Sequence, residues 1–427
     1  MSQSRLVRGS LFVFIANNTA NFGNFLYSLF MGRMLTPHAF GDLGATLSIL
    51  AIFSIPLSVF QLLMVKTISF YWGGRKTGVV KLLLHDLTPR LFLLGIFLTA
   101  ITILFAGKLS IFLQLENALP LIIISLIFVL SFSATLNRAT LQGTLSFSYL
   151  SANSIVEVIL KLIVSILLVI LNFGLVGAMM GTLIGAVGGY LLTVLELRIL
   201  FSKYASEENV KAPKWLNWKT ALPVLLTSLT ITLFFTSDII LVKHFFAPDV
   251  AGEYVALSTV GKIIYYLIGP IISVMFPLVS GRAGNGTPYI MPLLGTLVFA
   301  LGISSLLIFT YFLFPGLILS ILYGGRYAGA IPYMGIFSFF ITLLSVNSIL
   351  TYFLLSISSG KPIYFLFLIS LLQSVFIFFI HNSIREIIWI NIFVSLLYFT
   401  AASFFVWQKE KKVLTHILLK NIHRNMI

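Results

Sequence analysis

Two lysines lie deep in otherwise apolar segments, where a charged side chain is unfavourable unless it has a role. Lys161 lies within IVEVILKLIVSILLVIL, and Lys262 lies at a similar depth in another apolar segment. A cationic side chain in the bilayer core costs about 3 kcal/mol on insertion scales, so it is expected to face a water-filled cavity, a counter-ion or the interior of a helix bundle. Two ammonium groups in such a site would suit an anionic ligand, above all a diphosphate.

Carboxylates near these lysines offer alternative explanations. Glu157 precedes Lys161 by four residues, so the two side chains can form an ion pair on one helix, which lowers the cost of burying both. Lys262 has no acidic residue within four positions. Asp238 lies in a third apolar segment and is a candidate, with Glu157, for binding a coupling H⁺ or Na⁺. Pairing of Asp238 with Lys243, or capping near the outer end of its helix, is the simpler alternative.

Neutral polar residues and helix breakers complete the candidate site. The first apolar segment carries three asparagines on one helical face, which predicts contact with water in a cavity; interhelical hydrogen bonding is the alternative. Arg33, at an outer helix end, is a candidate phosphate ligand whose default role is to reach the headgroups. Residues that weaken a helix inside a span are candidate hinges. The asparagines are Asn17, Asn21 and Asn24, and the candidate hinges are Pro56, Gly269, Pro270 and Pro277.

The composition indicates a multi-pass membrane protein. Hydrophobic residues make up 59% of the 427 and charged residues 9%, whereas a soluble globule carries about 25% charged residues. The chain has no cysteine, which excludes disulfides and Cys-ligated metals. The first apolar run continues to Met31 without a small-residue cleavage site, so it is interpreted as a first span and not as a removed signal peptide.

Twelve segments are long and apolar enough to span a bilayer, which needs about 20 residues. They predict an all-α fold with an N-terminal six-helix bundle (1–197), a cytoplasmic linker (198–219), a C-terminal six-helix bundle (220–407) and a basic amphipathic tail (408–427). The predicted spans are 10–32, 41–65, 90–107, 118–137, 152–172, 175–197, 220–242, 253–279, 289–314, 331–355, 362–381 and 386–407.

Most of the 27 Lys and Arg residues fall in the segments on the side of both termini. The positive-inside rule therefore predicts cytoplasmic termini in a cell membrane. This distribution also accounts for the net charge of +15 without a nucleic-acid partner.

A short motif follows both the first and the seventh span. Residues 35–43 read LTPHAFGDL and residues 246–254 read FAPDVAGEY, so that each places Pro four residues before Gly and an acidic residue directly after it. We expect the Pro to break the preceding helix and the Gly to permit a turn before the next. Six spans separate the copies, which predicts parallel repeats about an axis along the membrane normal.

Four stretches of the chain resemble the patterns of the polysaccharide (Wzx-type) flippases in the multidrug/oligosaccharidyl-lipid/polysaccharide (MOP) exporter superfamily, which also contains MATE drug exporters. The resemblance covers about residues 10–365. In the family's pattern the position of Lys161 is more often Arg. Lysine keeps the positive charge of that arginine but loses its bidentate recognition of phosphate. The stretches are RMLTP (33–37) with Phe40-Gly41; LQG (141–143) through Glu157 and Lys161 to FGLVGA (173–178); DIILV (238–242) through GEY (252–254); and LYG (322–324) with Tyr327-Ala328 and SGK (359–361).

The resemblance implies a flippase that moves a polyprenyl-diphosphate-linked oligosaccharide from the inner to the outer leaflet by alternating access. Its expected partners are the lipid-linked substrate and membrane lipids, with a polysaccharide polymerase and glycosyltransferases in the same pathway. No cofactor or metal is expected beyond a coupling H⁺ or Na⁺, and the sequence has no P-loop and no HExxH motif.

Two alternative functions stay open. A MATE-like exporter of small cations would need acidic residues in its cavity, where this chain has basic ones. A membrane polysaccharide polymerase or glycosyltransferase would need a sizeable loop with convergent carboxylates, which the sequence lacks. A non-enzymatic transporter is therefore the expected class.

Overall fold

The computed structural model describes residues 3–202, 218–285, 287–357 and 360–425, and within these ranges every regular element is helical. Eleven helical segments of this part of the chain are long and apolar enough to cross a membrane. Another helix, α1, precedes them and runs for 32 residues. Each predicted span overlaps one of these helices, so the prediction of an all-α, multi-pass membrane protein is confirmed.

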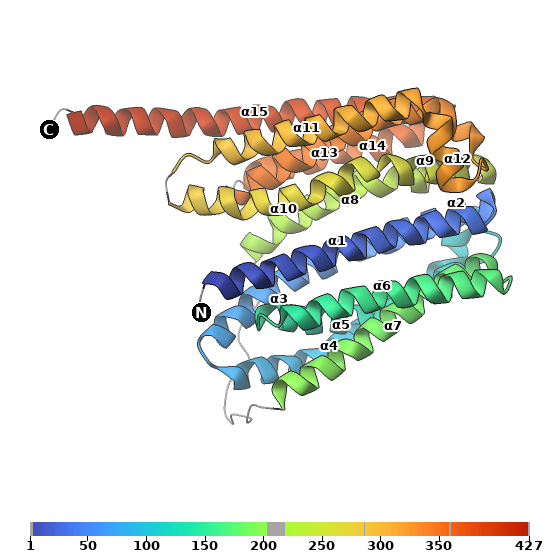
Figure 1. The fold of residues 1–427 in the computed structure, drawn as a ribbon, viewed down its shortest axis with the longest axis horizontal. Coiled ribbons are helices and arrows are strands. Elements are labelled where there is room, and N and C mark those ends of the chain that lie inside the picture. The colour runs from blue at the N-terminus through green and yellow to red at the C-terminus, as the bar shows by residue number, and fades with distance from the viewer. Residues whose placement is uncertain (1–2, 203–217, 286, 358–359, 426–427) are drawn as a thin grey trace. The chain divides into compact units, whose positions relative to one another are not determined.

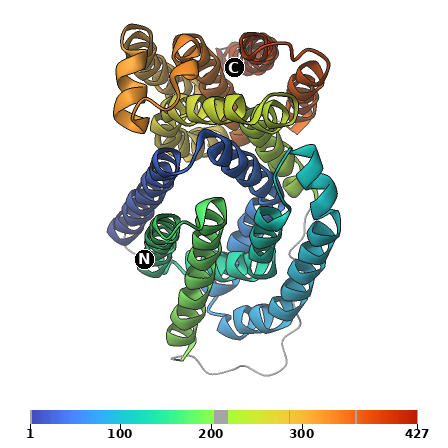
Figure 2. The ribbon, with the colours of Figure 1, turned by 90° about the vertical axis from the view of Figure 1, so that its right-hand side faces the viewer.

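The described chain divides into two compact units (Figure 1). The first comprises Met1–Ala221, Val242–Thr259 and Leu319–Gly329. In it α6 packs against α1 and α7, and α5 packs against α3, α4 and α7; Figure 2 views these helices end-on. This unit contains most of α9 (Pro248–Gly261) and the whole of α1 (Gln3–Met34), α2 (Pro37–Phe53), α3 (Ile55–Gly73), α4 (Thr77–Phe112), α5 (Leu119–Gly143), α6 (Phe147–Ile170) and α7 (Gly174–Phe201).

The second unit comprises Leu222–Leu241, Val260–Ile318 and Ala330–Ile427. Its central helix is α13, which packs against α10, α11, α14 and α15 and is the most buried candidate span. The remaining elements are α8 (Trp218–Phe245), α10 (Ile263–Gly284), α11 (Ile290–Leu313), α12 (Pro315–Tyr323), the 3₁₀ helix η1 (Ala328–Tyr333), α13 (Met334–Ser356), α14 (Gly360–Phe379) and α15 (Ile384–Asn425).

Small residues allow these helices to approach one another closely, as is usual in membrane bundles. A Cβ on Gly95 of α4 would overlap the carbonyl oxygen of Phe128 in α5. On α7, a Cβ on Gly181 would lie 2.8 Å from the Cα of Ser165 in α6. The backbone of α4 therefore touches that of α5, and the backbone of α7 touches that of α6.

Helices extend beyond several predicted spans. The third predicted span, 90–107, corresponds to Thr77–Phe112, because the charged residues that precede it in the sequence remain helical. The second and eighth spans each consist of two helices, which meet at Ser54 and at Lys262. Most of the predicted linker, 198–219, lies outside the described residues. α15 continues without interruption into the predicted tail, and the amphipathic face predicted there falls on side chains outside the description.

The glycines of the repeated motif have a different role from the expected one. Gly41 lies inside α2 and Gly252 inside α9, so neither forms a turn. A Cβ on Gly41 would lie 2.9 Å from the backbone nitrogen of Gly252, and a Cβ on Gly252 would overlap the carbonyl oxygen of Pro37. The two copies of the motif therefore pack backbone to backbone, and only glycine permits this contact.

Candidate functional site

Lys161 lies where α1, α6 and α7 meet. Its Nζ atom donates a hydrogen bond to Oδ1 of Asn24 at 3.2 Å and lies 3.9 Å from the centre of the Tyr27 ring. The Tyr27 hydroxyl donates to the carbonyl oxygen of Ala178 at 3.0 Å and accepts from Thr182, which holds the ring in place. An aromatic face beside an ammonium group stabilises the cation without neutralising its charge.

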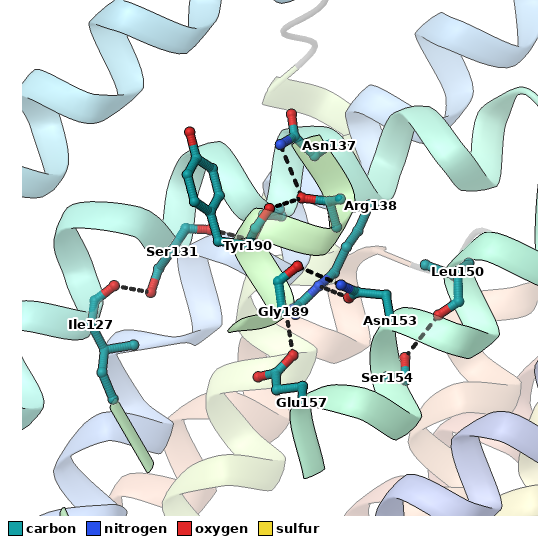
Figure 3. Close-up of polar contacts among 12 residues, drawn as sticks. Ile127, Ser131, Asn137, Arg138, Leu150, Asn153, Ser154, Glu157, Gly189 and Tyr190 are labelled. Carbon is teal, nitrogen blue, oxygen red and sulfur yellow. Dashed lines mark hydrogen bonds and ion pairs between the residues drawn. The ribbon is translucent and has the colours of Figure 1, made fainter. Parts of the chain in front are cut away.

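Glu157 pairs with Arg138 of α5 (Figure 3). The Arg138 guanidinium also donates through Nε to Oδ1 of Asn153 at 3.0 Å, and the Asn153 amide donates to the carbonyl oxygen of Gly189 at 2.5 Å. Both members of the ion pair are about three-quarters buried, with side-chain exposures of 27% and 29%. Glu157, the candidate partner of Lys161, therefore has a closer partner in Arg138 and interacts with Lys161 only over a longer distance.

Arg138 is the residue that the sequence analysis missed. The predicted span ended at residue 137 and placed Arg138 in the adjoining loop, whereas α5 continues to Gly143. With Lys161 and Arg138 against the single carboxylate of Glu157, the described cluster carries one excess positive charge. Close approach of α7 shapes it, because a Cβ on Gly185 would lie 2.9 Å from the Cβ of Lys161.

Lys262 is buried in the second unit, at the break between α9 and α10. Its Nζ atom donates to the carbonyl oxygen of Phe235 at 2.7 Å and lies 5.1 Å from the centre of that ring. Asp238, also fully buried, contributes a favourable electrostatic interaction to Lys262. The Asp238 carboxylate accepts from the Ile239 amide at 2.8 Å and lies 3.5 Å from the Asn391 amide nitrogen.

The other predicted site residues are spread over the chain. Asn21 and Asn24 are exposed on α1, and the side chain of Asn17 lies outside the description. Arg33 donates through Nε to the carbonyl oxygen of Leu322 at 2.6 Å and through a second nitrogen to that of Ile321. These bonds cap the carboxyl end of α12, as a cation there is expected to do.

A second arginine, Arg326, caps the carboxyl end of α1. Arg326 donates to the carbonyl oxygen of Leu35 at 3.3 Å, and the Tyr327 hydroxyl donates to that of Gly32 at 2.8 Å. Burial raises the pKa of Tyr327, so its phenol stays protonated and remains a donor. Arg33 therefore caps the end of α12 and Arg326 caps the end of α1, so the two arginines link these helix ends.

The candidate hinge residues lie near breaks or within one helix. Pro56 lies in the first turn of α3, next to the break at Ser54. α10 runs without interruption through the other three, which are Gly269, Pro270 and Pro277. The break in that span lies at Lys262 instead, and the hinge function stays a prediction.

A family model described as polysaccharide biosynthesis protein matches residues 6–281, which is more than half of the chain. The chain belongs to this family. A search of curated proteins finds no match.

Solved structures show which fold this polysaccharide biosynthesis family member has. An inward-facing MATE transporter of the MOP superfamily aligns with a TM-score of 0.75 and 14% identity over 92% of this chain and 96% of its own. A eukaryotic MATE transporter, AtDTX14, aligns with a TM-score of 0.67 and 14% identity over 97% of this chain and 100% of its own. A MOP superfamily transporter from Pyrococcus furiosus aligns with a TM-score of 0.62 and 15% identity over 93% and 95%. The chain therefore has the MATE fold.

Proposed function

We propose that this protein is a flippase for a polyprenyl-diphosphate-linked oligosaccharide in surface polysaccharide synthesis. The observation that supports the proposal is the basic cluster of the first unit, in which Arg138 pairs with Glu157 and the Lys161 amino group donates to the neutral side chain of Asn24. A diphosphate head group seeks several positive donors in a site of low dielectric constant. Membership in a polysaccharide biosynthesis family supports the same substrate class.

The sign of the charge argues against export of small cations. The Pyrococcus furiosus relative is described as having a binding pocket of reversed polarity that suggests a different function for that transporter. The excess positive charge around Lys161 supports a similar divergence from drug exporters here. Lys262 of the second unit is the second proposed phosphate ligand, and Asp238 is a proposed coupling site for H⁺ or Na⁺.

Transport in reconstituted vesicles tests the proposal. We expect the protein to move a fluorescent polyprenyl-diphosphate oligosaccharide between leaflets. The matched polyprenol-linked oligosaccharide without phosphate should move at least about tenfold more slowly. Protein-free vesicles are the control. Efflux of a cationic dye without movement of the oligosaccharide would favour the exporter instead.

We further propose that the protein lies in the cytoplasmic membrane with both termini in the cytoplasm. Because the chain has no cysteine, single cysteines can report its orientation. A cysteine near Lys76 is expected to react with an impermeant reagent only from the cytoplasmic side, and a cysteine near Lys108 or Asp249 only from outside. The reverse pattern of labelling would contradict this topology.

A further inference from the structure

An ion pair is buried where α8 meets α2, away from the lysine site. Nζ of Lys243 and Oδ1 of Asp42 lie 2.6 Å apart, and their side chains are 0% and 6% exposed. Neither atom has a hydrogen-bond partner of good geometry among the described residues. Each charge is therefore compensated almost entirely by the other, and leaving either one alone in this place would be strongly unfavourable.

A titratable chain leads from this pair to the surface. Nε2 of His38 lies 3.7 Å from Asp42, and Nδ1 of the same ring lies 3.8 Å from Glu116. The His38 side chain is 30% exposed and that of Glu116 77%. A cavity of about 230 Å³ joins these groups. Its remaining lining is neutral and consists of Thr36, Ala39, Leu115, Asn117, Pro120, Phe173, Leu175 and Val176.

The pair also lies at a mechanically important place in the chain. Helix α8 leaves the second unit at Leu241 and joins the first at Val242, immediately before Lys243. Directly beyond it, α9 packs on α2 through Gly252 and Gly41. Any movement that draws the end of α8 and the start of α9 away from α2 must separate Lys243 from Asp42.

We propose that Asp42 is a proton-binding site, loaded from the outer solution through His38 when Lys243 withdraws, which couples outward opening to proton uptake. The outer location rests on the proposed flippase topology. In the closed form the carboxylate is ionised and paired with the ammonium group. On opening, one proton passes from outer water through the imidazole to the Asp42 carboxylate, which becomes neutral. Closure returns that proton to the imidazole and to water, and restores the ion pair.

The closed contact can be followed without any substrate. Ala251 is 1% exposed beside Gly41, so the single change Ala251→Cys reports opening of α9 from α2. We expect labelling of this cysteine from outside to accelerate as the external pH falls from about 8 to about 5, by up to about tenfold per pH unit. The exposed Ala247→Cys corrects for the reagent's own pH dependence.

Variants identify the titrating group. Asp42→Asn mimics the protonated carboxyl, so labelling should be fast and independent of pH. Asp86→Asn removes a carboxylate from the exposed pair with Arg90 and should behave as the unchanged protein. Flat labelling in the unchanged protein, or a pH dependence that persists in Asp42→Asn, would overturn the proposal.

A last comparison separates proton binding from a purely structural ion pair. The double change Asp42→Asn with Lys243→Met removes both buried charges and should keep the folded yield. In vesicles with acid outside, we expect its translocation to show no acceleration, while the unchanged protein accelerates. If translocation by the double variant still accelerates with acid outside, the pair serves stability alone. Failure of the flippase proposal would abolish translocation in the unchanged protein but leave the labelling result intact.

Discussion

Replacing Lys161 with alanine is expected to slow translocation of the diphosphate-linked substrate about 10- to 100-fold while the protein stays inserted and folded. The expected size follows from the loss of one charge-assisted hydrogen bond, worth about 1.5–3 kcal/mol. Lys161→Arg should recover part of the rate, because the charge is retained. Translocation in vesicles, normalised to folded protein, is the measurement.

Two further variants make this result specific. Lys108→Ala is a matched control, because this exposed lysine also lies over an aromatic ring, 5.8 Å from the centre of Phe105, and should have no effect. Since Glu157 pairs with Arg138, Glu157→Gln should not rescue Lys161→Gln. Rescue would show that Lys161 serves only to neutralise Glu157.

Lys262→Ala is expected to impair translocation as Lys161→Ala does, and full translocation rates in both alanine variants would refute the proposed phosphate site.

The change Gly252→Ala is expected to destabilise the protein, and to do so more than the change Gly41→Ala at the other glycine of the repeated motif. The new Cβ would overlap the Pro37 carbonyl oxygen, and the backbone cannot yield as a flexible side chain would. Overpacking of this kind costs about 1–3 kcal/mol. We expect a lower thermal unfolding temperature in detergent and faster outside labelling of Ala251→Cys in the same chain.

Gly302→Ala provides the control for this prediction. Gly302 lies inside α11, and an added Cβ would have no neighbour within 4 Å. Alanine also favours the helix more than glycine does. An unfolding temperature as low in Gly302→Ala as in Gly252→Ala would show that the close contact between α2 and α9 is not the cause.

The spans and the polar face around Lys161 could be predicted because they depend on local sequence. Apolar runs of sufficient length are directly visible, and a lysine within such a run requires a polar environment wherever it lies. Arg138 was missed because a span was assumed to end at its first charged residue. In the structure that residue is still helical and forms an ion pair with a neighbouring helix.

The pairing of Lys243 with Asp42 could not be predicted in this way. The two residues are far apart in sequence, and the nearer carboxylate, Asp238, offered a local alternative. Packing of the end of α8 and the start of α9 against α2 brings them together. The repeated Pro and Gly were visible in the sequence, but the distance between their two copies depends on tertiary packing. Neither could a local pattern show that Arg33 caps another helix.

The uneven division of the chain has a practical consequence for experiments with gene fragments. The first unit needs Val242–Thr259 and Leu319–Gly329 in addition to the N-terminal spans. Cutting the gene between α7 and α8 therefore leaves the N-terminal product without two segments of its unit, whereas the C-terminal product carries the whole second unit together with those two segments. We expect the N-terminal fragment to be degraded when produced alone, and coexpression of the C-terminal fragment to stabilise it by complementation. A tandem duplication whose copies fold independently would not show this dependence of the N-terminal half on the C-terminal half.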